Sequence, residues 1–193
     1  MDLGSKVRGV SWIWVAVAVV VVLFVLLVIA TFNRLVRLRN RAENSWAQID
    51  VQLKRRADLV PNLVESVKGY AAHERGTFEA VTQARAQTQG ARSVEERAEA
   101  ENALTAALGR LIAVAEAYPQ LRASENFQQL QQQLSETENK IAVSRQVYND
   151  TVLTYNTVLE TFPTNLVAGM LGFHPRTYFE ADDAAREAPQ VKF

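Results

Sequence analysis

Two histidines are the first residues whose type could support metal or acid–base chemistry. His73 and Glu74 begin like the zinc-protease motif His-Glu-x-x-His, in which two histidines bind the metal from one helix face, but Thr77 occupies the second histidine position. A di-iron bundle requires Glu-x-x-His on its helices, and Tyr70 stands where that glutamate would be. His174 belongs to a different segment. We therefore expect no metal site at His73, which fits an exposed helix position.

Other catalytic patterns are missing from the sequence. It has no cysteine, which removes thiolate nucleophiles, disulfides and cysteine metal sites. It has no Gly-x-Ser-x-Gly turn and no glycine-rich phosphate loop. The formal net charge is zero, which argues against a nucleic-acid partner. An acidic cluster falls on more than one face of a predicted helix and is interpreted as a solvated surface: Glu95, Glu96, Glu99 and Glu101. We expect no enzyme activity, no cofactor, no metal and no small-molecule substrate.

An apolar stretch, residues 12–32, is the element that must position the rest of the chain. It contains no charge, proline or glycine, and Thr31 is its only polar side chain apart from the tryptophans. About 20 apolar residues of helix cross the hydrocarbon core of a bilayer. Trp12, Trp14 and Phe32 stand at its two ends, where aromatic rings prefer the headgroup level. The stretch predicts a single-pass transmembrane helix that anchors the chain to the lipid bilayer.

Four arginines follow this stretch within ten residues, and no acidic residue lies between the stretch and Glu43. The arginines are Arg34, Arg37, Arg39 and Arg41. Two basic residues, Lys6 and Arg8, precede it. The positive-inside rule then places the N-terminal stub, residues 1–11, outside and the remainder in the cytoplasm, by a margin of two charges. Contact of the arginines with lipid headgroups is favoured over a merely solvated helix face. The alternative is a cleaved signal peptide ending near Ala30, which the length of the apolar run and the arginines after it disfavour.

Helical spacing continues beyond the stretch through Leu35, Leu38, Ala42, Ile49 and Leu53. Helix could therefore run unbroken to about residue 57. Two alternatives stay open there: a turn, with a new helix beginning behind Asp58, or one long helix with a kink at Pro61.

Three further helical patterns follow, with short links and no strand-like alternation. The first continues to about residue 87 and is weakened but not ended by Gly69 and Gly76, before a loop at residues 88–92. The second opens with a capping box at residues 93–96 and is closed by Pro119. The third runs from about Ser124 to Phe162. The predicted fold is all-α: a transmembrane helix continuing into an antiparallel four-helix bundle, residues 33–175.

The end of the chain carries two further features. Residues 166–173 form a short apolar segment, predicted either to fold over one end of the bundle or to make an interfacial or oligomer contact. Residues 176–193 are predicted to be a loose acidic tail.

Polar side chains beside the apolar stripes form the last candidate site: Trp46, Asp50, Tyr148, Asn149, Tyr155 and Asn156. Such groups can hydrogen-bond between helices and fix their register. They can also present a face to a protein partner. The structural role is favoured over the partner-binding one.

Several ordered blocks of the sequence resemble the LemA family: residues 39–56, 58–64, 69–74, 118–121, 125–127, 136–141, 148–150, 155–156 and 160–166. One departure is Ala57, where the family usually has histidine. The resemblance implies a bacterial inner-membrane protein with an outward N-terminal stub and a cytoplasmic four-helix bundle. It supplies no catalytic residues. Some members of the family are linked to membrane organisation or remodelling.

These observations predict a non-enzymatic scaffold or adaptor at the bacterial inner membrane, with protein partners or self-association. The alternative is a sensor or regulator of a membrane enzyme or signalling system.

Overall fold

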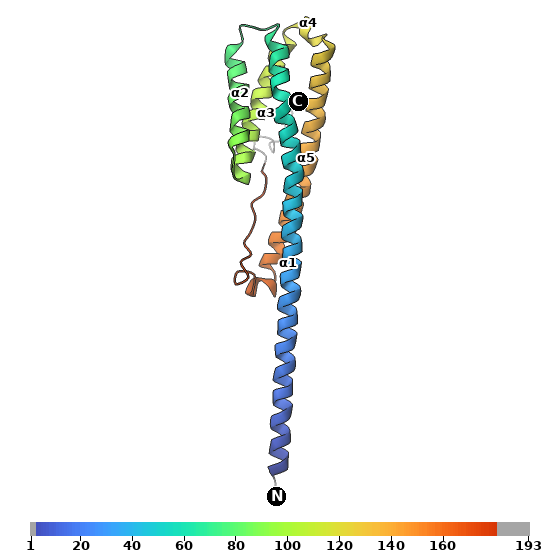
Figure 1. Cartoon of the computed structure of the whole chain (residues 1–193), viewed down its shortest axis with the longest axis vertical. Coiled ribbons are helices and arrows are strands. Elements are labelled where there is room, and N and C mark those ends of the chain that lie inside the picture. Colours follow the sequence, from blue (N-terminus) through green and yellow to red (C-terminus); the bar gives the residue numbers. More distant parts are fainter. Residues whose placement is uncertain (1–2, 181–193) are drawn as a thin grey trace, which may run out of the picture. The chain divides into compact units, whose positions relative to one another are not determined.

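A computed structural model describes residues 3–180, with side chains from residue 12 onward. Its elements are the helices α1 (Leu3–Lys68), α2 (Arg75–Gly90), α3 (Val94–Glu116), α4 (Pro119–Arg122) and α5 (Glu125–Glu160), followed by a 3-10 turn, η1 (Thr164–Leu166) (Figure 1). No strand occurs within residues 3–180, which confirms the all-α prediction.

The chain divides into two compact units. The N-terminal unit combines the chain up to Arg41 with Leu153–Arg176, and the bundle unit combines Ala42–Val152 with the chain from Thr177 onward. Helices α1 and α5 each contribute residues to both units.

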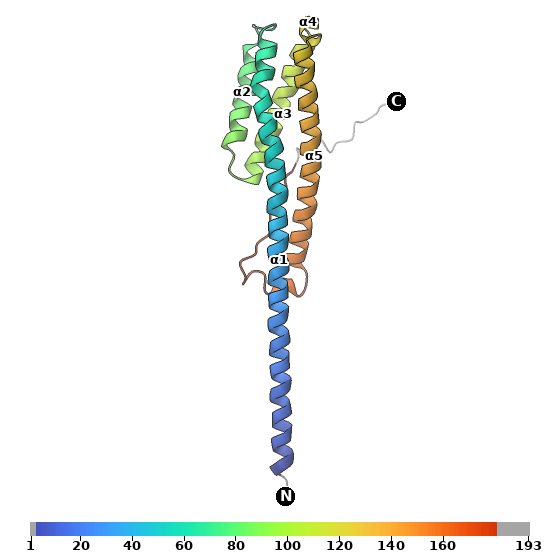
Figure 2. The same ribbon diagram turned by 45° about the vertical axis from the view of Figure 1, so that its right-hand side comes forward.

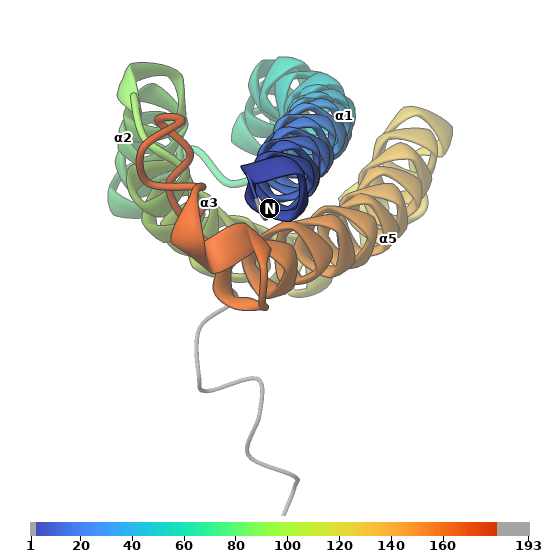
Figure 3. The same cartoon turned by 90° about the horizontal axis from the view of Figure 1, so that it is seen from below.

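The bundle unit contains the predicted antiparallel four-helix bundle. Its helices are the last part of α1, α2, α3 and most of α5, which lie side by side in both Figure 1 and Figure 2. Short links connect them, so successive helices run in opposite directions. Figure 3 views them end-on, with α2 and α5 on either side of α1. The largest apolar cluster joins Val60, Leu63, Leu104, Leu108 and Leu134, all almost completely buried.

Helix α1 continues through Pro61, which resolves the alternatives left open at Asp58. A proline inside a helix has no N–H to give to the carbonyl four residues earlier. That carbonyl belongs to Ala57, and the Nε–H of Arg85 on α2 donates to it at 2.8 Å. A side chain of the neighbouring helix therefore replaces the missing main-chain hydrogen bond.

The prediction that Gly69 weakens a helix without ending it is wrong. Helix α1 ends at Lys68, and α2 begins only at Arg75. The N–H of Ala71 donates to the carbonyl of Val67 at 2.9 Å, so the link folds back on the last turn of α1. Glycine lowers the stability of helix because it loses more backbone entropy than other residues on folding. The loop predicted at residues 88–92 is shorter than expected, because α2 extends to Gly90.

The capping box of α3 is present in a shifted form. The N–H of Glu96 donates to Ser93 Oγ at 3.1 Å, as predicted, but the Glu96 carboxylate accepts from the N–H of Arg92 at 2.8 Å instead of that of Ser93. Pro119 follows the end of α3 and is the first residue of α4, where its missing N–H costs little.

The N-terminal unit has its own apolar cluster. Leu35 of α1 packs with Tyr155, Leu159, Ala168 and Phe173. The predicted apolar segment thus folds back onto α1 and α5 through Ala168 and Phe173. These contacts all lie within the N-terminal unit.

The predicted loose tail begins too early. Arg176 hydrogen-bonds through both of its backbone groups, and Phe179 is buried in the bundle unit. Residues 176–179 therefore pack against the helices. Residues 181–193, with most of the acidic side chains of that prediction, lie outside the described residues.

Candidate functional site

The apolar stretch of α1 leaves its side chains uncovered. Its large apolar residues are between 40% and 73% exposed from Trp12 to Phe32, apart from a half-buried Val28. By length and composition, α1 contains one segment able to cross a membrane. A signal sequence near the N-terminus can meet the same criterion of length and composition. Trp12 and Trp14 are exposed, whereas Phe32 packs edge-on against Phe173 with ring centroids 5.6 Å apart.

The four arginines after this stretch, at positions 34, 37, 39 and 41, are all exposed. The guanidinium of Arg39 lies over the ring of Phe173, 5.6 Å from its centroid, in cation–π geometry. Arg39 therefore contributes to packing in the N-terminal unit as well as to the basic surface of α1.

Asn156 and Tyr155 hold the chain that follows α5 in the N-terminal unit. The Asn156 amide donates to the carbonyl of Arg176 at 2.8 Å, and its oxygen accepts from the N–H of Arg176 at 2.9 Å. Both backbone groups of one residue are thus satisfied by one side chain. The hydroxyl of Tyr155, a buried ring, donates to the carbonyl of His174 at 3.1 Å.

Asn149 and Tyr148 make equivalent hydrogen bonds to backbone groups in the bundle unit. The Asn149 amide donates to the carbonyl of Phe179 at 3.1 Å, and its oxygen accepts from the N–H of Phe179 at 2.9 Å. Tyr148 donates to the carbonyl of Thr177 at 2.9 Å. Trp46 completes this contact, with its ring 5.4 Å from that of Tyr148 and 5.5 Å from that of Phe179. The Tyr-Asn pairs thus bind the protein's own chain.

Thr177 also links this segment to the start of α3. A hydrogen bond from the Thr177 side chain lowers the pKa of the Glu95 carboxyl, with smaller effects in the same direction from the Glu95 backbone and from Ser93. Residues 177–179 therefore contact α1, α3 and α5 of the bundle unit.

A buried ion pair crosses the bundle between α1 and α3. Arg56 lies 3.6 Å from the Glu101 carboxylate, and the side chains are only 4% and 5% exposed. Arg56 also donates to Thr105 at 2.8 Å and to Glu138 of α5 at 3.4 Å. The interpretation of Glu101 as a solvated residue is wrong. The reason is its position three residues before Leu104, on the inner face of α3.

Arg97 and Asp50 extend this network to the edge of the bundle. Arg97 pairs with Asp50 at 2.7 Å, lies 3.9 Å from Glu101, and donates to the carbonyl of Thr88. Asp50, predicted for an interaction face, is therefore engaged in an ion pair between α1 and α3.

Burial dominates the protonation of this network. Desolvation raises the pKa of Glu101 to about 6, although Arg56 and Arg97 favour its charged form, and Asp50 adds a small effect in the raising direction. Burial also lowers the pKa of Arg56, against the opposing effect of Glu101 and Glu138. Both Glu101 oxygens lack a hydrogen-bond partner among the described residues, so the carboxylate is held by charge alone.

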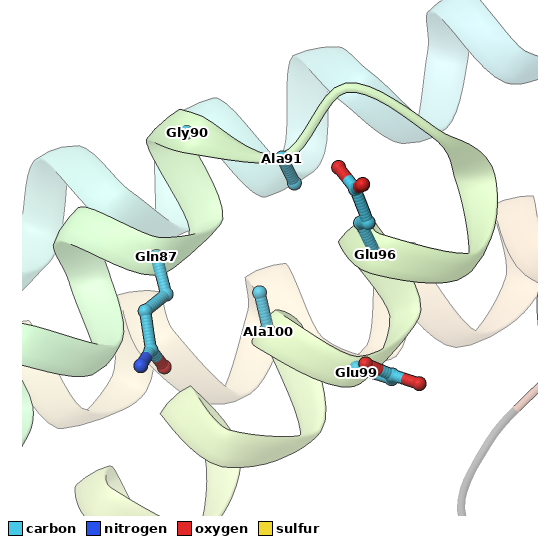
Figure 4. Close-up of a pocket in the computed structure, with 6 residues that line it drawn as sticks. All are labelled: Gln87, Gly90, Ala91, Glu96, Glu99 and Ala100. Atoms are coloured by element: carbon cyan, nitrogen blue, oxygen red, sulfur yellow. The ribbon is translucent and has the colours of Figure 1, made fainter.

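Two open hollows of the bundle unit carry little chemistry. One hollow of about 460 Å³ lies where α2 meets α3 and is lined by Gln87, Gly90, Ala91, Glu96, Glu99 and Ala100 (Figure 4). A second, of about 360 Å³, lies between α1 and α5 and is lined by Ala47, Gln48, Val51, Gln52 and Ser144. Within residues 3–180, no group of three or more histidine, aspartate or glutamate side chains is placed to hold a metal ion.

The sequence patterns above do not predict the buried ion pair or the backbone partners of the asparagines. A signal for the asparagines was present: Tyr-Asn recurs after seven residues, at 148–149 and 155–156, so both pairs fall at nearly the same angle on α5. The ion pair also has a signal in the sequence. Arg56 lies three residues after Leu53 and Glu101 three residues before Leu104, so both charged residues fall on the apolar faces of their helices.

Comparison with known proteins gives one family and a few curated relatives. The LemA family profile matches residues 45–193. Magnetosome protein MamQ 2 of Paramagnetospirillum magneticum is 27% identical over 199 residues, which cover 87% of this chain and 72% of that protein. Magnetosome protein MamQ of Magnetospirillum gryphiswaldense is 24% identical over 197 residues, with the same coverages. Protein LemA of Metamycoplasma hominis is 28% identical over 166 residues, covering 85% of this chain and 75% of that protein.

Proposed function

Since this chain belongs to the LemA family, we propose that it is a non-enzymatic, membrane-anchored scaffold that presents its helical bundle at the bacterial inner membrane, with a role in membrane organisation. Three of the relatives carry the name magnetosome protein, and a scaffold role is compatible with that name.

The uncovered apolar stretch of α1 is the single observation that carries this proposal. Soluble proteins rarely expose contiguous apolar patches of more than a few hundred Å². Here about six turns of helix expose valine, leucine, isoleucine and phenylalanine. A bilayer covers such a surface and requires the internally hydrogen-bonded backbone that a helix provides.

The orientation follows from the arginines. These exposed side chains can contact the headgroups of the leaflet at which the stretch ends. Four positive charges on that flank against two on the other favour a cytoplasmic bundle and an outward N-terminus.

A partner contact is best supported at the groove between α1 and α5 in the bundle unit. Val51 on α1 and Val143 and Val147 on α5 are exposed, and Val51 also lines the groove. By contrast, Trp46, Asp50, Tyr148 and Asn149 are engaged within the unit. A protein partner or a second copy would therefore meet the valines first.

The native sequence has no cysteine, so a single one can be introduced as a crosslinking site. Val51→Cys should give a defined adduct with a partner or a second copy in cells at native expression. Ala103→Cys, at an exposed position on α3, serves as the control and should give none. Only uncrosslinked chain with Val51→Cys, or equal adducts with both variants, would contradict a contact at this groove.

A further inference from the structure

Three large apolar side chains are unusually exposed in residues 161–173, the turn that follows α5. Phe162 is 79% exposed, Leu166 64% and Met170 88%. They recur every four residues, whereas Ala168 and Phe173 from the same turn are buried. The turn thus divides its apolar side chains between an inner set that holds it in place and an outer set with no cover from the described chain.

The inner set attaches the turn to α1 at the point where the apolar stretch ends. Phe173 contacts Phe32, the last residue of the stretch, and Arg39, two turns further along. Ala168 and Phe173 also share a cluster with Leu35. All these residues belong to the N-terminal unit, and Figure 1 shows the turn beside this part of α1.

The charge around the turn is positive. The four arginines at positions 34–41 are exposed on α1, and no acidic residue occurs between Trp12 and Ala42. Within residues 153–176, Glu160 is the only acid and is offset by Arg176. Exposed apolar side chains beside basic ones are the combination that binds the headgroup and acyl boundary of anionic membranes.

We propose that Phe162, Leu166 and Met170 insert into the lipid surface at the inner end of the transmembrane stretch, forming a second contact with the same leaflet. The inference rests on the proposed anchoring by residues 12–32. A lipid occupant is favoured over a second protein copy because the turn is packed directly onto the end of that stretch. The contact would fix the N-terminal unit to the membrane at two places, the spanning helix and the turn.

Depth-dependent fluorescence quenching can test this contact in the full chain. Single cysteines are introduced at Leu166 and Met170, labelled with a small fluorophore, and reconstituted at low protein-to-lipid ratio in vesicles of phosphatidylethanolamine and phosphatidylglycerol. Part of the lipid carries bromine at a shallow or a deep acyl position. Val143→Cys, 63% exposed on α5 in the bundle unit, is the matched control for Leu166→Cys, and Val20→Cys reports on the spanning stretch.

We expect shallow-bromine quenching at Leu166→Cys and Met170→Cys to exceed that at Val143→Cys several-fold, with Val20→Cys quenched most by deep bromine. Quenching at residues 166 and 170 equal to that at residue 143, with Val20→Cys still quenched, would overturn the lipid contact and leave the anchor intact. Failure to quench Val20→Cys would overturn both. A disulfide-linked dimer through Met170→Cys without quenching would assign the turn to a second copy instead.

Discussion

Arg85 of α2 donates its Nε–H to the main-chain oxygen of Ala57 in α1, 2.8 Å away. Pro61 leaves that oxygen without its usual helical partner. The proline is therefore accommodated by a neighbouring helix, and α1 continues to Lys68 instead of ending at Asp58.

Arg85→Met should destabilise the full chain in detergent by about 2 kcal/mol, because a charged hydrogen-bond donor to a partly buried carbonyl is lost. Pro61→Ala restores the N–H within α1, so Arg85→Met should cost about 1 kcal/mol less in that background. Urea unfolding of the four variants of this cycle measures the coupling. Arg75→Met, an exposed arginine on the same helix, is the control and should change stability by less than about 0.5 kcal/mol. Equal costs of Arg85→Met with and without Pro61 would contradict the compensation.

Asn156→Ala should release the chain after α5 at one defined amide. The N–H of Arg176 loses its acceptor, so its hydrogen exchange should accelerate by about tenfold or more. The N–H of Phe179, held by Asn149, should change less, and Asn149→Ala should reverse the pattern. Exposed Asn139→Ala on the same helix is the control. Unchanged exchange at Arg176 in Asn156→Ala would show that the side chain is not what protects this amide.

Glu101 should make stability depend on pH in an unusual direction for a carboxyl group. Its pKa is about 6 in the fold and near 4.5 when unfolded, so the folded state binds more protons between these values. The stability from this group is full below about pH 4.5 and is lost as the pH rises to about 6, by about 2 kcal/mol in total. Arg56, Arg97 and Asp50 act on the Glu101 carboxyl, and Glu138 pairs with Arg56.

Glu101→Gln should remove this slope, whereas Glu99→Gln, an exposed neighbour on α3, should retain it. Urea unfolding in detergent between pH 4.5 and 7 measures both variants against the native chain. Identical slopes in the native chain and in Glu101→Gln would rule out a buried carboxyl with a raised pKa. Arg56→Met should be costly at pH 7, by about 3–5 kcal/mol, because it leaves Glu101 buried without its main partner.

The helical periodicity was sufficient to predict the all-α class, the bundle and the apolar stretch, because each depends on the side-chain pattern along single helices. Ser93 and Glu96 also predicted the start of α3, since capping is local. The end of α1 at Lys68 cannot be predicted from Gly69 alone. Glycine disfavours helix only modestly, and the packing of the surrounding helices decides whether the helix ends there. The sequence alone leaves a turn at Asp58 open. The residue that allows the helix to continue through Pro61 is Arg85, which is distant in sequence and gives no local signal.

The candidate sites were less predictable for the same reason. Tyr148, Asn149, Tyr155 and Asn156 stand out in the sequence as polar residues beside an apolar stripe. Their partners in the fold are backbone groups of residues 174–179, which carry no side-chain signal. Glu101 was assigned to the surface with its acidic neighbours. Its place in line with Leu104, and that of Arg56 in line with Leu53, would have indicated a buried pair of opposite charge.

We propose that residues 12–32 remain as a membrane anchor, with the bundle in the cytoplasm. The most direct measurement is protease protection in spheroplasts of the full chain tagged at both ends. We predict that both tags are found on one membrane-bound chain, and that external protease removes the N-terminal tag but leaves the C-terminal tag intact. A chain that has already lost its N-terminal tag, or a C-terminal tag digested from outside, would contradict the claim.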